Sequence, residues 1–151
     1  MCWGEQCDNF QTQTECVDCH SSCLNNNFQK KKWKKLEVRS TDGKGFGLFA
    51  KEPIPSGSFV IEFLGEIINH EEYVSLLQDV SGQRMYVLAL KSKTYIDCRK
   101  KGSIARFINH SCEPNCRLEV WIVNNHLKIG AVCLKDIAMD EELSFDYQWD
   151  P

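Results

Sequence analysis

The sequence is a succession of short apolar segments separated by glycine, proline and asparagine turns, and this pattern restricts the fold more than any other feature. Segments of strand length occupy residues 35–41, 42–50, 58–68, 85–90, 94–98, 116–123, 126–134 and 142–147. Asn124 and Asn125 predict a hairpin turn between two of them. Only residues 70–80 have helical spacing, with an apolar stripe made of Tyr73, Leu76, Leu77 and Val80. We therefore predict a mostly β fold with little helix.

Cysteine is concentrated at the start of the chain. Five of the nine cysteines fall within the first 23 residues, and the run ECVDCHSSC contains the spacing Cys-x2-Cys-x3-Cys. Short loops with this spacing can wrap thiolates around a tetrahedral Zn²⁺, and His20 could substitute as a ligand. An odd cysteine total without a secretory signal disfavours a disulfide framework; buried thiols plus one disulfide are the alternative. The start of the chain therefore predicts a zinc site.

Composition excludes some classes of function. The chain has 151 residues, which is enough for one domain with a small appended module. A net charge of -3 and a pI near 5.8 argue against a domain that wraps nucleic acid, and fit a basic partner better. The cysteines lack the Cys-Cys-His-His pattern and the basic helix of a DNA-reading finger. No segment is apolar enough to span a bilayer, so we expect no membrane contact.

Three separated motifs occur in an informative order. They are KGFGLFA at residues 44–50, RFINHSCEPNC at 106–116 and ELSFDY at 142–147. In this order, and at about these intervals, they resemble the SET domain of protein lysine methyltransferases, with FVIEFLGEII as a further typical segment. The resemblance runs from about Leu36 to Trp149. It implies a SET-domain fold of several small sheets, in which the second and third motifs thread through each other in a knot-like arrangement.

The glycine-rich motif has two interpretations. Taken alone, Gly45 and Gly47 around Phe46 fit a tight hairpin turn as well as a ligand site. The resemblance to SET domains implies that this motif holds S-adenosylmethionine, together with residues from elsewhere in the chain. The cofactor contacts that it implies are Lys44, Gly45, Phe46, Arg84, Met85, Tyr86, Arg106, Asn109 and His110. His110 is then a binding residue and not a general base.

Methyl transfer from a sulfonium to a lysine is an in-line displacement, which needs alignment and a neutral amine. An apolar channel beside the cofactor's positive charge lowers the amine pKa from its value of ~10.4 in water. The resemblance implies a channel of Phe63, Tyr86, Phe145 and Tyr147, with Tyr147 as the catalytic tyrosine. It links Phe145 to the number of methyl groups that fit. Phe63 and Met85 stand where close relatives have tyrosines, which leaves product specificity open.

The early cysteines, followed by CLNNNFQKK, resemble the AWS zinc module that precedes one SET subgroup. We therefore expect an AWS-like module at residues 1–33, either complete or truncated at its start, and a SET domain at residues 34–151. A full AWS module binds two metals with seven cysteines, whereas this sequence supplies five. The resemblance implies one complete site of Cys2, Cys16, Cys19 and Cys23, with Cys7 in an incomplete one. We also expect the post-SET segment of relatives to be absent.

Two classes of function follow from the resemblance. The first is an enzyme that methylates a lysine of the histone H3 tail, in the lysine-36 class, as a monomer in the nucleus. Its partner is then the H3 tail or the nucleosome, with nucleic acid contacted only through the nucleosome. The second is a non-catalytic SET relative that binds or scaffolds chromatin. Asn109, His110 and Tyr147 favour the enzyme, whereas Phe63 and Met85 favour the scaffold.

Overall fold

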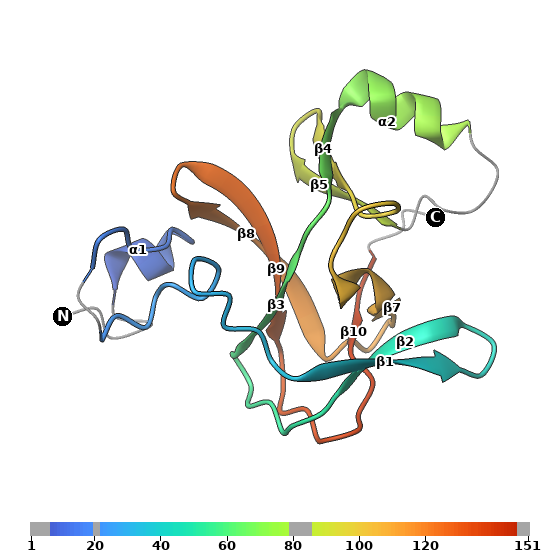
Figure 1. Cartoon of the computed structure of the whole chain (residues 1–151), viewed down its shortest axis with the longest axis horizontal. Helices are drawn as coiled ribbons and strands as arrows, with labels where there is room; N and C mark the ends of the chain where they lie inside the picture. Colours follow the sequence, from blue (N-terminus) through green and yellow to red (C-terminus); the bar gives the residue numbers. More distant parts are fainter. Residues whose placement is uncertain (1–6, 20–21, 79–85, 148–151) are drawn as a thin grey trace.

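The computed structural model describes residues 7–19, 22–78 and 86–147 of the chain. Within them the protein is mostly β, as predicted, and its strands form several small sheets (Figure 1). The helical elements are α1 (Asp8–Gln11), α2 (His70–Leu77) and the short 3-10 helix η3 (Ile104–Phe107). The strands are β1 (Leu36–Thr41), β2 (Gly45–Ala50), β3 (Phe59–Phe63), β4 (Glu66–Asn69), β5 (Val87–Lys91), β6 (Thr94–Asp97), β7 (Asn109–His110), β8 (Cys116–Val123), β9 (His126–Cys133) and β10 (Ser144–Phe145).

The central sheet has the order β3-β9-β8 and is antiparallel throughout. The predicted hairpin turn joins β8 to β9, and Asn124 and Asn125 both have positive φ, of 49° and 64°. Asparagine adopts this conformation more readily than other side chains with a Cβ, which explains why the pair allows so tight a turn. The sheet's inner face contributes Val60, Ile61 and Ile129 to the buried core.

A second antiparallel sheet has the order β4-β6-β5, and α2 lies beside it (Figure 1). The helix begins with a capping box, in which Asn69 and Glu72 each accept a hydrogen bond from the other's backbone N–H. It ends at Leu77, earlier than predicted, and Val80 lies outside the described residues. None of its residues is buried, so the apolar stripe does not enter the core.

The chain threads through itself where β7 meets β10. These two short strands pair in parallel, although their residues lie far apart in the sequence. Leu143 donates its N–H to the Leu48 carbonyl of β2, which fixes the other side of the same segment. The buried side chain of Asn115 donates to the Glu142 carbonyl and accepts from the Ser144 N–H, both at 2.8 Å. The segment before Tyr147 is therefore held from both sides.

The cysteine-rich segment is fastened to the outer edge of the central sheet. Glu15 N–H donates to the Ile122 carbonyl and Ile122 N–H to the Gln13 carbonyl, so a short parallel bridge covers β8. The carboxylate of Glu15 is buried and accepts the backbone N–H groups of Phe28 and Gln29. These bonds satisfy a carboxylate that would otherwise be costly to bury.

Candidate functional site

A cavity of about 620 Å³ opens beside the β1–β2 hairpin, and we call it the hairpin cavity. Its volume lies in the range of pockets that hold small organic ligands. Its lining contains every predicted cofactor contact within the described residues, and Arg84 and Met85 lie outside those residues. The lining residues are Gly43, Lys44, Gly45, Phe46, Tyr86, Arg106, Phe107, Asn109, His110 and Tyr147. Gly43 and Phe107 were not predicted.

The hairpin forms one wall because its glycines permit a backbone that other residues rarely adopt. Gly43 and Gly45 have positive φ, of 79° and 76°, at the turn between β1 and β2. A Cβ added to Gly47 would lie 2.6 Å from the Glu142 Oε1 atom, closer than van der Waals contact allows. The glycine motif therefore makes a tight turn and also lines the hairpin cavity.

Asn109 joins the three sequence motifs. Its side-chain Nδ2 donates to the Phe46 carbonyl oxygen at 3.1 Å and to Glu142 Oε1 at 2.7 Å. Phe46 belongs to the first motif, Asn109 to the second and Glu142 to the third. Glu142 was not predicted as a site residue, because its position before the apolar part of ELSFDY reads as the exposed end of a strand.

His110 is anchored by the segment that follows β10. Its Nδ1 accepts the backbone N–H of Tyr147 at 3.2 Å, and the two rings meet edge to face at 5.4 Å. With Nδ1 used as an acceptor, the proton of the neutral ring lies on Nε2, which is 3.4 Å from Cys112 Sγ. This arrangement fits the predicted binding role better than that of a general base.

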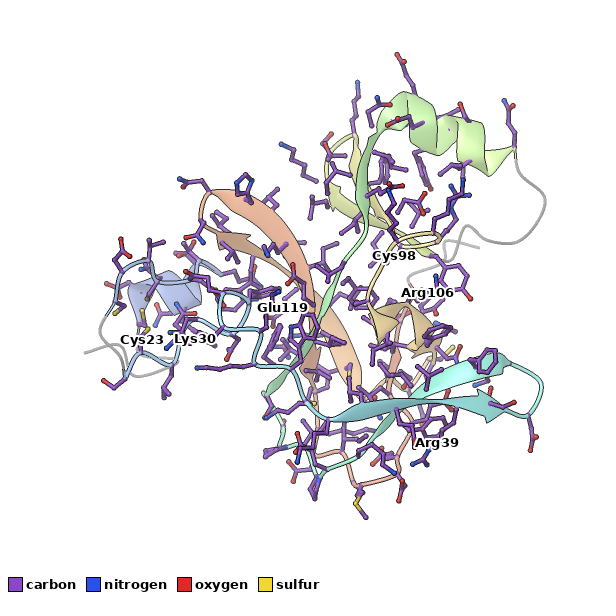
Figure 2. The ribbon with its side chains drawn as sticks, viewed as in Figure 1. Cys23, Lys30, Arg39, Cys98, Arg106 and Glu119 are labelled. Atoms are coloured by element: carbon purple, nitrogen blue, oxygen red, sulfur yellow. The ribbon has the colours of Figure 1, made fainter. Side chains whose placement is uncertain are left out.

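A small pocket of about 10 Å³ lies beside the hairpin cavity, and we call it the channel. The two share Tyr86, Arg106 and Tyr147 as lining residues, so they adjoin each other at these side chains. The channel contains all four predicted residues, and its full lining is Phe63, Tyr86, Leu88, Cys98, Arg106, Ile108, Phe145 and Tyr147. Figure 2 shows Cys98 and Arg106 in this region, well away from Cys23 beside α1.

The channel is mainly apolar, and the Arg106 guanidinium is the one charged group in its described lining. Phe145 lies against both Phe63 and Tyr147, with ring centroids 5.9 and 4.5 Å apart. Burial raises the pKa of the Cys98 thiol to about 11, an effect that the nearby Asp97 carboxylate strengthens. Leu88, Cys98 and Ile108 were not predicted here, because nothing in their local sequence distinguishes them from core residues.

The Tyr147 hydroxyl lies where the channel meets the hairpin cavity. It donates a hydrogen bond to the Ile108 carbonyl at 2.7 Å. Burial raises its pKa to about 12, with Tyr86 as the second cause. The phenol is therefore neutral at physiological pH, so it can orient a ligand by its oxygen lone pairs and does not act as a phenolate base.

The other end of the channel meets a groove of about 800 Å³, which we call the outer groove. Leu88, Phe145 and Tyr147 line both the channel and this groove. Its remaining residues are Tyr73, Val87, Ala89, Tyr95, Pro114, Cys116, Arg117, Leu118, Val120, Ile129, Leu134 and Asp146. Residues of the channel thus border both the hairpin cavity and the outer groove, so ligands in these two sites would lie near each other at Tyr147.

The cysteine cluster lies apart from these cavities. The Sγ atoms of Cys16, Cys19 and Cys23 all lie within 4.8 Å of one another, as metal ligands do. Cys7 Sγ is 3.5 Å from Cys16 Sγ, so it borders the same cluster. The side-chain amide of Asn25 also approaches Cys16 Sγ, at 3.5 Å, and would stabilise a thiolate. Cys2 and His20 lie outside the described residues.

A family model for the SET domain matches residues 45–148, which include the second and third motifs and all of the first except Lys44. The chain belongs to the SET-domain family. It is 40% identical over 154 aligned residues to "Histone-lysine N-methyltransferase, H3 lysine-36 specific" of Schizosaccharomyces pombe, covering 97% of this chain and 19% of that protein. It is 39% identical to the human "Histone-lysine N-methyltransferase SETD2", covering 97% of this chain and 6% of that protein.

Solved structures also include chains that are similar to this one. A chain from "an active polycomb repressive complex 2 in the stimulated state" matches with a TM-score of 0.87 and 29% identity, over 97% of this chain and 22% of that one. A second matching structure, with a TM-score of 0.77 and 32% identity, is ctPRC2 "bound to S-adenosylmethionine"; the match covers 83% of this chain and 16% of that one. Among the described residues, no helix is long and apolar enough to cross a membrane.

The raised pKa of Tyr147 gives a testable pH dependence. Between pH 10 and about 12 the native protein keeps this proton and the unfolded chain loses it. Stability from this group is therefore complete below pH ~10 and is lost as the pH rises through the native pKa. In rapid pH-jump absorbance titrations of the native protein, Tyr147→Phe should remove one phenol with a midpoint of about 12. Removal of a phenol that titrates near the ordinary value of ~10 would contradict the burial of this hydroxyl.

Proposed function

We propose that this SET domain transfers a methyl group from S-adenosylmethionine to a lysine of the histone H3 tail, in the lysine-36 class. The observation that carries the proposal is the mainly apolar channel at Tyr147, whose lining residues also border the hairpin cavity and the outer groove. A lysine that reached the channel from the outer groove would bring its amine next to a methyl donor in the hairpin cavity. The names of the relatives support the histone substrate.

The hairpin cavity suits the cofactor in size and in the chemistry of its lining. Lys44 can pair with a carboxylate, Phe46 and Phe107 offer ring surfaces, and Asn109 and the hairpin backbone offer polar groups. We assign Lys44, Gly45, Phe46, Tyr86, Arg106, Asn109 and His110 to cofactor binding, with Arg84 and Met85 as unplaced members of the set. When bound, S-adenosylmethionine supplies an electrophilic methyl group on a sulfonium.

The chain's own residues would prepare the lysine. Phe63, Phe145 and Leu88 exclude water from the channel, which disfavours the charged ammonium and lowers the pKa of the amine. Tyr147, held by its bond to Ile108, orients the amine toward the hairpin cavity. Aromatic rings also tolerate a methylated ammonium, because their faces attract cations. We assign Tyr147 the catalytic role.

A non-catalytic SET relative is the second candidate, favoured by Phe63 in place of a tyrosine. Phe63 is 3% exposed and packs against Phe145, so the substitution fills the channel wall and removes only a hydroxyl. The channel and both open sites still meet at Tyr147. A scaffold has no need of this arrangement, and we therefore prefer the enzyme.

The partner that we propose is the basic H3 tail, free or on the nucleosome, and the site of action is chromatin in the nucleus. An acidic chain with a net charge of -3 suits a basic tail and gives no general attraction for DNA. We propose that nucleic acid is contacted only through the nucleosome and that the domain acts as a monomer. The chain spans about a fifth, or less, of the relatives' length, so these assignments concern this domain alone.

We further propose that residues 1–33 form an AWS-like zinc module before a SET domain at 34–151. The cluster of Cys16, Cys19 and Cys23 supports one Zn²⁺, with Cys2 as the fourth ligand and Cys7 assigned to an incomplete second site. Such a metal would supply part of the folding free energy of a segment this small.

Metal analysis tests the zinc assignment. The purified protein should contain about one Zn²⁺ per chain, and a strong chelator should remove it and unfold the cysteine-rich segment. Cys23→Ser should lose the metal, whereas Cys112→Ser, an exposed thiol outside the cluster, should retain it. A metal-free native protein whose Cys16, Cys19 and Cys23 thiols all react freely would refute this assignment.

Methyl transfer tests the enzyme assignment. Tyr147→Phe removes one oxygen from the end of the channel, so the rate of transfer to recombinant nucleosomes should fall ~10²–10³-fold, about 2.7–4 kcal/mol. Affinity for S-adenosylmethionine should change little. Ser92→Ala, which removes an exposed hydroxyl between β5 and β6, is the matched control. The scaffold becomes the better interpretation if the parent binds the cofactor without methylating histones, or if Tyr147→Phe retains the parent's rate.

A further inference from the structure

Two tyrosines form a stacked aromatic pair that lines the outer groove. Tyr73 of α2 and Tyr95 of β6 stack with ring centroids 4.0 Å apart and an interplanar angle of 15°. The Tyr95 hydroxyl lies 3.2 Å from His70 Nδ1, which holds the ring in place. Both tyrosines line the outer groove and are half-buried. We call this pair the tyrosine platform.

The platform and the channel lie on opposite faces of the sheet β4-β6-β5. Tyr95 is the cross-strand partner of Ala89, and partners in a ladder share a face. Leu88, the next residue along β5, points to the other face and lines the channel. The outer groove includes Leu88 and Ala89 together, so it passes along the edge of β5, where both faces can be reached.

Among the described residues, no strand pairs with the outer edge of β5. In the order β4-β6-β5 this strand has a ladder partner on one side, and its residues Val87, Leu88 and Ala89 line the groove. An extended peptide that adds to this edge would alternate its side chains between the two faces. If its lysine enters the channel on the Leu88 face, the side chains at odd offsets from that lysine point to the Ala89 face.

We propose that the tyrosine platform is a specificity subsite for an apolar side chain of the substrate, at an odd offset from the methylated lysine. This inference rests on the proposed function and adds a determinant of sequence preference to it. The platform side of the groove consists of Tyr73, Tyr95, Val87 and Ala89, none of which is charged. Among the described lining residues the only carboxylate is Asp146, the neighbour of Tyr147, so an apolar occupant fits better than a guanidinium.

A positional scan of peptide binding tests the subsite. The probes are fluorescent H3-tail peptides whose acceptor lysine is replaced by norleucine, with each flanking residue changed in turn to leucine, aspartate or arginine. With S-adenosylmethionine present, one odd offset should prefer leucine over aspartate by roughly tenfold in Kd. Tyr73→Ala should abolish the preference at that offset alone, whereas Tyr73→Phe should keep it.

Ala89→Arg provides an independent variant, because it adds a cation beside Tyr95 without removing the aromatic stack. It should convert the same odd offset to a preference for aspartate. Unchanged affinity for S-adenosylmethionine would show that each variant is folded. Three results would overturn the proposal. The leucine preference could fall at an even offset, or the parent could prefer arginine at the odd offset. Tyr73→Ala could also leave the Kd values of all peptides unchanged or weaken them all equally.

Peptide binding tests the tyrosine platform separately from methyl transfer. The norleucine peptides cannot be methylated, so their profile does not depend on turnover. Absent methyl transfer with an intact odd-offset preference would refute the proposed enzyme and leave the platform as a peptide subsite. Active methyl transfer with a flat binding profile would refute the platform alone.

Discussion

The hydrogen bonds of the Asn109 side chain hold together the parts of the site that lie far apart in the sequence. One amide group donates to the Phe46 carbonyl and to the Glu142 carboxylate, and β7 pairs with β10 directly alongside. Because the same threading carries Tyr147 to the channel, the hairpin cavity and the channel cannot be placed independently. The position of a bound methyl donor relative to a bound amine is therefore set by one local arrangement.

That arrangement also explains how a chain of small sheets supports a precise site. None of the sheets in the described residues has more than three strands, so no single sheet spans the molecule. Rigidity comes instead from buried polar clamps between segments, such as the Asn115 side chain that holds Glu142 and Ser144. Buried polar groups that are fully bonded specify one arrangement, because every alternative leaves some of them unpaired.

Much of the fold could be predicted from the sequence, and the residues that were missed depend on contacts between distant parts of the chain. Most strand segments, the Asn124–Asn125 turn and the spacing of Cys16, Cys19 and Cys23 depend on nearby residues, and they were predicted correctly. The segment 58–68 was wrongly given as one strand, because it divides into β3 and β4 of different sheets, and within 142–147 only Ser144–Phe145 is a strand. Glu142 and Asn115 were missed, because their partners are brought to them only by the threading. The apolar stripe of α2 was predicted but its partner was not: no residue of the helix is buried, and Tyr73 stacks on the half-buried ring of Tyr95.

Calorimetric titration of S-adenosylmethionine into Asn109→Ala tests most directly whether the hydrogen bonds of the Asn109 side chain build the cofactor site. The variant leaves the Phe46 carbonyl and the Glu142 carboxylate without their shared donor, a loss that typically costs ~1–3 kcal/mol. The affinity should therefore fall by roughly five- to 150-fold, while circular dichroism shows a native fold and the metal content is unchanged. An affinity equal to the parent's, in a folded variant, would contradict the account.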